Sequence, residues 1–313
     1  MGAIKHIVKS QDFTPQQLGH LFDRADAHVK ALKDPAKVAS LQKLGAGRQV
    51  FTLFYEPSTR TRVSFEAAAN NLGLRVVGTE NAREFSSSAK GETIEDTVRV
   101  LCQYHPAAII MRHHEEGAAE RAAAVSTVPI INGGDGRGQH PTQAMLDLYT
   151  IHRELGRLEN INIVIGGDLA NGRTARSLVY LLSRYPGVHF SFVAPESLAM
   201  SQDIKDHLAE HNVGYHETQE LGDVLTEADV VYWTRVQKER LAEGVDYLAV
   251  SNRYELGREH LAQMKQQAII MHPLPRVNEI KPEVDADPRA AYFRQAGYGL
   301  PVRMALFEWS IGL

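Results

Sequence analysis

Cysteine is almost missing from this sequence: Cys102 is the only one among 313 residues. No disulfide can therefore form within the chain, and we expect a reducing, cytoplasmic location. Long apolar runs are missing too, and none approaches the roughly 18 residues of a membrane-spanning helix. The first stretch, MGAIKHIVKSQDFTPQQ, has no apolar core of the kind found in secretion signals. We therefore predict that the chain is neither a disulfide-stabilised protein nor a membrane-spanning one.

An excess of positive charge is also missing, since 34 Lys and Arg face 38 Asp and Glu and the net charge is −4. A protein that binds nucleic acid in general is usually basic, so no nucleic-acid partner is expected. The 14 histidines include none with the spacing of a zinc site. His113 and His114 are adjacent and cannot share one face of a helix, so we predict no metal there.

What the sequence does contain is a regular alternation of short apolar runs and helical patterns, which is typical of an α/β fold with parallel sheets. Its length suggests two domains of roughly 150 residues each. We therefore predict two domains, each a parallel sheet flanked by helices. The predicted strands are QVFTLFY, AAIIM, VPIIN, INIVIGG, HFSFVAP, DVVYW and AIIMHP.

The seam between the predicted domains is the glycine-rich segment NGGDGRGQHPTQ. We assign 1–141 to the first domain, 142–154 to a connecting helix and 155–291 to the second domain. The tail, 292–313, has apolar residues at helical spacing and is expected to pack back on the first domain. Its apolar positions include Val302, Leu306 and Trp309.

The segment FYEPSTRTRVSFE joins a predicted strand to a predicted helix. Apolar residues with helical spacing follow it: Phe65, Ala68, Ala69 and Leu72. Ser58 then lies near the N-cap, where free backbone N–H groups and the positive end of the helix dipole meet. With hydroxyls and arginines added, this predicts a phosphate site. The alternative is that Ser58 only caps the helix and the arginines are solvated, although a strand end in a parallel sheet favours a ligand.

The segment GQHPTQ predicts a second group of donors. Pro141 suits the first position of a helix, so His140 and Gln143 can face one way over the helix start. Both are neutral donors that can polarise a carbonyl oxygen. The alternative is a histidine beside a helix cap with Gln143 exposed.

Five further segments place chemistry-bearing residues near strand ends or in loops, and two prolines in MHPLPRVNE predict rigid backbone carbonyls. Each is a weak signal alone. Together, several arginines and a lysine in an acidic protein indicate a small polyanionic ligand. The residues are Arg112 in IIMRHH, Ser86 and Lys90 in the polar loop SSSAKGET, Arg173 in GDLANGRTARS, Arg235 and Gln237 in YWTRVQKER, and Leu274 and Pro275 in MHPLPRVNE.

In combination and in this order, S-T-R-T-R, H-P-T-Q and H-P-L-P-R resemble the aspartate/ornithine carbamoyltransferases over essentially the whole chain. The resemblance implies transfer of the carbamoyl group of carbamoyl phosphate to L-aspartate, giving N-carbamoyl-L-aspartate and phosphate in pyrimidine biosynthesis. It implies no metal and no organic cofactor. Arginines suit the two carboxylates of aspartate, and His272-Pro273-Leu274-Pro275 stands where ornithine enzymes typically have His-Cys-Leu-Pro. Transfer to ornithine or another amine, and a non-catalytic scaffold, remain the alternatives.

The resemblance also assigns roles to residues. Catalysis would involve Arg60, Thr61, Lys90, Arg112 and His140. Carbamoyl phosphate would be bound by Ser58, Thr59, Arg60, Thr61, Ser86, Lys90, Arg112, His140, Gln143, Leu274 and Pro275. Aspartate would be bound by Lys90, Arg173, Arg235 and Gln237. Domain closure would involve Glu56, Glu239 and Arg240.

The resemblance further implies a homotrimer with shared active sites, in which the loop of Ser86 and Lys90 reaches a neighbouring subunit. The chain departs from some family members at Ala89, where they carry an extra lysine, and at Ala170-Asn171. The sequence leaves open whether regulatory chains or a dihydroorotase join the trimer, and whether the enzyme is allosteric.

Overall fold

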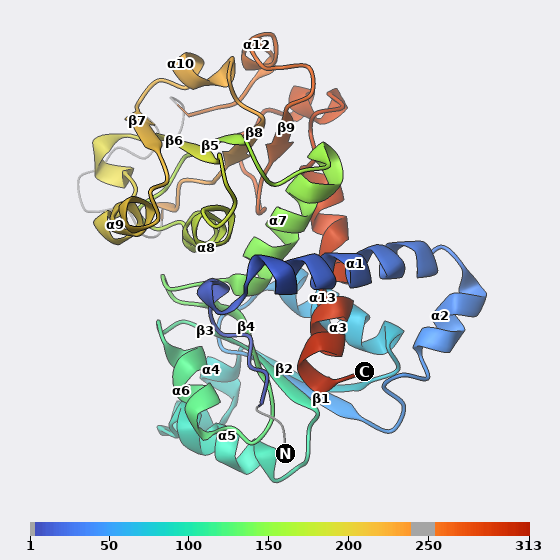
Figure 1. The fold of residues 1–313 in the computed structure, drawn as a ribbon. Coiled ribbons are helices and arrows are strands. Elements are labelled where there is room, and N and C mark those ends of the chain that lie inside the picture. The colour runs from blue at the N-terminus through green and yellow to red at the C-terminus, as the bar shows by residue number, and fades with distance from the viewer. Residues whose placement is uncertain (1–3, 239–253) are drawn as a thin grey trace. The chain divides into compact units, whose positions relative to one another are not determined.

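A computed structural model describes residues 4–238 and 254–313. The chain forms two compact units: unit 1 is Met1–Met145 with Tyr298–Leu313, and unit 2 is Leu146–Gly297. Each contains one parallel sheet flanked by helices, which confirms the predicted fold class (Figure 1). The finer division predicted from the sequence, with 142–154 as a connecting helix, stays a prediction.

Unit 1 has a four-stranded parallel sheet in the order β2-β1-β3-β4. Its strands are β1 (Gln49–Phe54), β2 (Arg75–Glu80), β3 (Ala108–His113) and β4 (Ile130–Asp135). Its helices are α1 (Pro15–Ala31), α2 (Pro35–Leu41), α3 (Thr59–Asn71), α4 (Ala82–Phe85), α5 (Ile94–Cys102) and α6 (Ala118–Val125), with short 3-10 helices η1 (Ser10–Asp12) and η2 (Ser87–Lys90). Helix α7 (Pro141–Leu155) begins in unit 1.

The core of unit 1 follows from the alternation of side chains along its strands. On β1, Phe51 and Leu53 join a buried cluster with residues of α5 and α6, as does Tyr55 just beyond the strand. Val50 and Phe54 have the opposite parity and are also fully buried, so the sheet is covered on both faces. This explains why the central strands read as continuous apolar runs.

Local signals set the ends of two helices in unit 1. Pro15 begins α1, and Thr14 and Gln17 exchange hydrogen bonds across its first turn as a capping box. The four apolar positions predicted after Ser58 are buried, three on α3 and Leu72 at its C-cap, and Gly73, with φ of +76°, follows that cap.

Helix α13 (Tyr292–Ile311) runs from unit 2 into unit 1. In unit 1 its Phe307 packs edge-on against Phe65 of α3, with ring centroids 5.9 Å apart. The guanidinium of Arg303 lies 4.9 Å from the centre of the same Phe65 ring. Neither α13 nor any other described helix is long and apolar enough to cross a bilayer.

Unit 2 has a five-stranded parallel sheet in the order β7-β6-β5-β8-β9. Its strands are β5 (Asn162–Gly166), β6 (His189–Val193), β7 (Tyr215–Thr218), β8 (Val230–Trp233) and β9 (Ile269–Met271). Its helices are α8 (Arg173–Leu182), α9 (Gln202–Glu210), α10 (Gly222–Leu225) and α12 (Arg258–Leu261), with η3 (Glu196–Leu198) and η5 (Pro282–Ala286).

Trp233 is a central residue of the unit 2 core and is fully buried. Its indole N–H donates to the carbonyl of Tyr254 at 2.8 Å, so the polar atom of the ring is satisfied. Gly166 on the neighbouring strand allows this packing, because a Cβ there would lie 2.1 Å from the indole ring. The ends of β5 and β8 are thereby held close together.

Candidate functional site

The loop between β1 and α3 carries the first predicted group of residues. Ser58 is the N-cap of α3, as predicted, yet its side chain makes no capping hydrogen bond. The reading in which Ser58 serves only as a cap is therefore not supported. Thr61 is buried in the first turn of the helix, whereas Arg60 is exposed. Partial burial lowers the pKa of the Arg60 guanidinium, which remains a cation at neutral pH.

Arg112 lies at the end of β3, next to the loop that holds Ser58. Its Nη1 donates to the carbonyl of Gly133 at 3.2 Å, and its Nη2 forms an ion pair with Glu56. The backbone carbonyl of Arg112 accepts a hydrogen bond from the Tyr55 N–H at 2.8 Å. The ends of β1, β3 and β4 therefore meet at this guanidinium, and Glu56, predicted for domain closure, binds Arg112 within unit 1.

His140 is buried directly before α7, which begins at Pro141 as predicted. Its Nδ1 lies 3.5 Å from the Thr142 hydroxyl, and its backbone carbonyl accepts from the Gln143 N–H at 3.0 Å. His140 and Gln143 are thus both fixed at the first turn of this helix. The structure places them in unit 1 with Ser58, Thr61 and Arg112.

Asp135 is a supporting residue that the sequence analysis missed. Its carboxylate accepts from the Gln139 N–H at 2.9 Å, from the Gly117 N–H at 2.9 Å and from the Asn132 amide at 3.2 Å. These bonds fix the path of the chain from β4 to His140. The signal in the sequence was the Asn-Gly-Gly-Asp-Gly turn, in which a short acidic side chain commonly bonds nearby N–H groups.

The segment SSSAKGET differs from the predicted loop, because it contains η2, which ends at Lys90, directly after the short helix α4. The Ser86 hydroxyl accepts from the Ser88 N–H at 3.2 Å and caps η2. Lys90 is exposed, and Gly91 closes the turn with φ of +91°. A serine-rich turn and a 3-10 helix look alike in sequence, since both use local hydroxyl-to-backbone bonds.

In unit 2, Arg173 and Gln237 are brought together at the ends of neighbouring strands β5 and β8. Arg173 is the first residue of α8, and Gln237 follows β8. Asp168, fully buried and missed by the sequence analysis, accepts from the Asn171 N–H at 3.0 Å and from the Gln237 N–H at 3.1 Å. The Gln237 amide also donates to the Asn171 carbonyl at 3.1 Å. Arg235, partly buried, lies two residues before Gln237.

The third strand end of unit 2, after β9, carries the predicted rigid carbonyls. His272 is fully buried; its Nδ1 accepts from the Leu274 N–H and its Nε2 donates to Glu279, both at 2.8 Å. Glu279 also accepts from the Val277 and Asn278 N–H groups at 3.0 and 3.1 Å. His272 and Glu279 thus act as a brace for Leu274 and Pro275, which are joined by a cis peptide bond.

Each unit therefore carries its share of the predicted residues at the carboxyl ends of its strands, where ligands bind in such sheets. Glu239 and Arg240 lie outside the described residues. The roles assigned to all of these side chains stay predictions.

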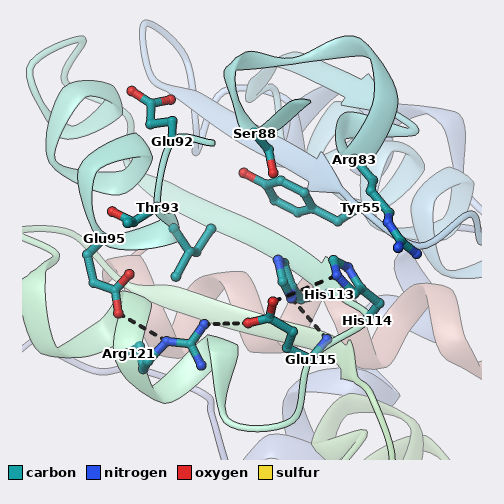
Figure 2. Close-up of a pocket in the computed structure, with 11 residues that line it drawn as sticks. Tyr55, Arg83, Ser88, Glu92, Thr93, Glu95, His113, His114, Glu115 and Arg121 are labelled. Carbon is teal, nitrogen blue, oxygen red and sulfur yellow. Dashed lines mark hydrogen bonds and ion pairs between the residues drawn. The ribbon is translucent and has the colours of Figure 1, made fainter. Parts of the chain in front are cut away.

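A pocket of about 430 Å³ in unit 1 is lined by His113, His114 and Glu115 among others (Figure 2). The two imidazoles stack, with centroids 4.4 Å apart and planes at 21°. The argument that adjacent histidines cannot share one face of a helix therefore does not apply, because His113 ends a strand and neither residue lies on a helix. Burial, together with the neighbouring His114, lowers the pKa of His113 to about 4.

The metal-ligating atoms of His113, His114 and Glu115 lie within 4.8 Å of one another. Two of these groups already have protein partners. His113 Nδ1 accepts the Glu115 N–H at 3.0 Å, and the Glu115 carboxylate binds Arg121 at 2.7 Å. We therefore assign no metal to this cluster.

Comparison with known proteins gives matches along almost the whole chain. Residues 5–153 match the family described as aspartate/ornithine carbamoyltransferase, carbamoyl-P binding domain, and residues 159–310 match its Asp/Orn binding domain. Aspartate carbamoyltransferase of Arabidopsis thaliana, chloroplastic, is 50% identical over 97% of this chain and 77% of its own length.

Two solved structures are similar. The catalytic subunit of the M. jannaschii aspartate transcarbamoylase has a TM-score of 0.88 and 44% identity, covering 97% of both chains. The Trypanosoma cruzi aspartate transcarbamoylase in complex with carbamoyl phosphate and aspartate has a TM-score of 0.89 and 39% identity, covering 98% of this chain and 96% of the other. The latter enzyme has also been solved with N-(phosphonacetyl)-L-aspartic acid.

These relatives correct the predicted cytoplasmic location. Proteins from Arabidopsis thaliana, Pisum sativum and Oryza sativa, 49–50% identical to this chain, are chloroplastic, which contradicts that prediction. The prediction rested on the single cysteine, and a low cysteine count does not distinguish one reducing compartment from another.

Proposed function

Because the chain belongs to the aspartate/ornithine carbamoyltransferase family, we propose how its own residues perform the transfer. The chain is a carbamoyl-group transferase, an aspartate carbamoyltransferase of pyrimidine biosynthesis. It converts carbamoyl phosphate and L-aspartate to N-carbamoyl-L-aspartate and phosphate. The observation that carries the residue assignments is the meeting of three strand ends at Arg112, beside an N-cap serine whose hydroxyl does not cap its helix.

Carbamoyl phosphate binds first, with its phosphate on the helix N-terminus formed by Ser58, Thr59, Arg60 and Thr61. The backbone N–H groups, the helix dipole and the hydroxyls all favour an anion there. The carbonyl oxygen of the substrate accepts hydrogen bonds from Thr61, Arg112 and His140. The carbamoyl nitrogen is held by Gln143 and by the carbonyls of Leu274 and Pro275.

The neutral amino group of aspartate attacks the carbonyl carbon, and a tetrahedral intermediate forms with negative charge on oxygen. The three donors stabilise that charge, each by about 3 kcal/mol. The C–O bond to phosphate then breaks, and the leaving phosphate takes the proton of the attacking amine. No enzyme nucleophile and no general base are needed.

The two carboxylates of aspartate are paired with Arg173 and Arg235, with Gln237 as a further donor. Guanidinium groups bind carboxylates by two parallel hydrogen bonds, which suits a dicarboxylate. Ornithine would instead bring a side-chain cation to these arginines, which would repel it. The bonds from Asp168 to the backbone on both sides support this assignment, because they hold Gln237 beside the start of α8.

We assign Ser86 and Lys90 to a neighbouring subunit's active site, in a homotrimer. Lys90 is exposed at the end of η2, so its ammonium can reach a group outside its own chain. It would bind both the phosphate and aspartate in that site. Regulatory chains and a dihydroorotase partner are not required by this mechanism.

The acceptor is tested by phosphate release from carbamoyl phosphate with the purified chain, in the presence of aspartate, ornithine or neither. Of the three conditions, only the one with aspartate should give phosphate release. Release with ornithine would keep the phosphate site but refute the roles of Arg173 and Arg235. Absence of release with either acceptor would contradict catalysis by this chain on its own.

Replacing Arg235 with alanine should raise the KM for aspartate by about 10- to 100-fold, because one carboxylate loses a charge-assisted partner. The KM for carbamoyl phosphate should change little. Steady-state kinetics with each substrate varied in turn measure both constants. Arg235→Lys is the matched control and should recover part of the loss; an unchanged aspartate KM in Arg235→Ala would remove this residue from the substrate site.

A further inference from the structure

A second pocket of unit 1, of about 580 Å³, lies at the amino ends of its strands. We call it the amino-end groove and define it by Lys5, Arg48, Arg75, Tyr104, His105 and Trp309, which line it with other residues. Its volume falls in the range of small-molecule sites. The groove and the phosphate loop lie at opposite ends of β1, roughly 17 Å apart along the strand.

The charge in the amino-end groove is of one sign. Lys5, Arg48 and Arg75 contribute cations, and no Asp or Glu lines the groove among residues 4–238 and 254–313. The whole chain, by contrast, has a net charge of −4. Side chains of like charge around one concave surface repel each other and attract an anion.

Arg48 and Lys5 each contact a group of this chain, whereas the Arg75 side chain has no such contact among the described residues. Arg48 donates to the carbonyl of Ile311 at 3.0 Å, in the last turn of α13, where cations favour the helix dipole. The Arg75 side chain has no hydrogen-bond or ion-pair partner in the described part of the chain. Its backbone N–H donates to the Arg48 carbonyl at 3.0 Å, so the two residues are neighbours at the amino ends of β1 and β2.

The direction of Arg75 follows from strand pairing. Arg75 is in register with Gln49 across the parallel pair of β2 and β1, so both side chains leave the same face of the sheet. The Gln49 side chain donates to the carbonyl of Tyr104 at 2.9 Å, and Tyr104 lines the groove. Arg75 is thereby directed toward the same surface.

Aromatic rings form the other part of the groove. Tyr104 is 58% exposed, so its ring is available to a ligand. The Trp309 indole packs on Phe13, with centroids 4.9 Å apart, and Lys5 lies 5.3 Å from the centre of the indole ring. The groove thus presents a flat indole with a cation over it, beside two arginines.

We propose that the amino-end groove binds a nucleoside phosphate. The phosphates bind Arg75, Arg48 and Lys5, because guanidinium and ammonium groups pair strongly with phosphate oxygens. The base stacks on Trp309 or Tyr104, since aromatic side chains accept any base on their faces. The ligand sits at the amino ends of the strands, away from the carboxyl ends where the transfer reaction is placed.

Calorimetric titration of the full chain with ADP, adenosine and inorganic pyrophosphate tests the proposal. The catalytic site is first filled with N-(phosphonacetyl)-L-aspartate, so that phosphate binding there does not contribute. ADP should bind one molecule per chain, about tenfold or more tightly than pyrophosphate, because the base adds stacking. Affinity should fall as salt is raised.

Three variants locate the binding. Arg75→Ala should lower the affinity for ADP by about tenfold, since it removes a charge-assisted contact. Trp309→Phe should abolish the fluorescence change on ADP addition, because the other tryptophan, Trp233, is fully buried in unit 2. Lys37→Ala is the matched control: this lysine of α2 has a side chain that is 63% exposed, it does not line the groove, and its loss should leave ADP binding unchanged.

Each contrary result would refute one part of the proposal. No ADP binding once the catalytic site is filled would refute the groove as a site. Equal affinity in Arg75→Ala and the unaltered chain would place the ligand elsewhere. Pyrophosphate binding as tightly as ADP would refute the nucleoside part and leave a plain anion site.

Discussion

Replacing Arg60 with alanine should lower kcat by about 100- to 1,000-fold, the usual cost of removing a donor that meets charge developing in the transition state. Arg60 lies in the first turn of α3, where we propose that the helix N-terminus and the guanidinium bind the same phosphate. Because its side chain is exposed, folding should be little affected. Turnover at saturating substrates and a thermal unfolding curve measure the two effects separately.

Arg62 is the matched control for this experiment, because it is the other arginine of the same motif. Its guanidinium binds Glu80 at 2.9 Å and lies 3.6 Å from Glu66, so it already has partners within unit 1. Arg62→Ala should therefore keep kcat within about threefold, as expected for loss of a partly exposed ion pair. Equal losses in both variants would mean that the motif acts through helix stability and not through a phosphate contact.

Replacing Glu308 with glutamine should lower the free energy of unfolding by about 3 kcal/mol at neutral pH. Glu308 is a buried residue of α13, 2.8 Å from Arg24 and 3.2 Å from His28. Burial raises the pKa of its carboxyl, but the contacts with His28 and Arg24 outweigh burial and bring the pKa from 4.5 down to about 2. The ionised carboxylate thus stabilises the folded chain.

The pH dependence of this effect has a definite sign. Since the pKa of Glu308 is lower in the folded chain, its contribution is complete above about pH 4.5 and is lost as the pH falls toward 2. Urea unfolding of both proteins at pH 7 and near pH 3 should show the difference shrinking. Glu120→Gln, at a half-exposed carboxylate paired with Lys9, is the control and should show little difference at either pH. A Glu308→Gln difference that is equal at both pH values would contradict the lowered pKa.

The seven strands predicted from the sequence are all present, because each is largely buried and reads as an apolar run. Two strands escaped prediction, β2 and β7, and both lie at the edge of a sheet. Val77 of β2 is 55% exposed and Tyr215 of β7 is 37% exposed, so neither strand carries a buried apolar pattern. The other two edge strands, β4 and β9, were predicted because their side chains are buried, so exposure and not edge position alone removed the signal.

The residues of the candidate site also fall into those that the sequence predicted and those that it did not. Side chains that would touch substrates, such as Arg112 and Arg235, were visible because charged residues after a buried strand stand out. Asp168 and Asp135 were not, because they accept N–H groups from Gln237 and Gly117, which are 69 and 18 positions away. Such pairing depends on how the chain folds back, which local spacing does not encode.

The path of α13 has a consequence for how the protein is made. The chain is synthesised from its N-terminus. All of unit 2 therefore emerges from the ribosome before residues 298–313, which complete unit 1. Until then, Phe65 lacks its contact with Phe307 and Arg24 lacks Glu308. Unit 1 is therefore synthesised first but is the last to be completed. A chain truncated before residue 298 would lack the part of α13 that packs in unit 1.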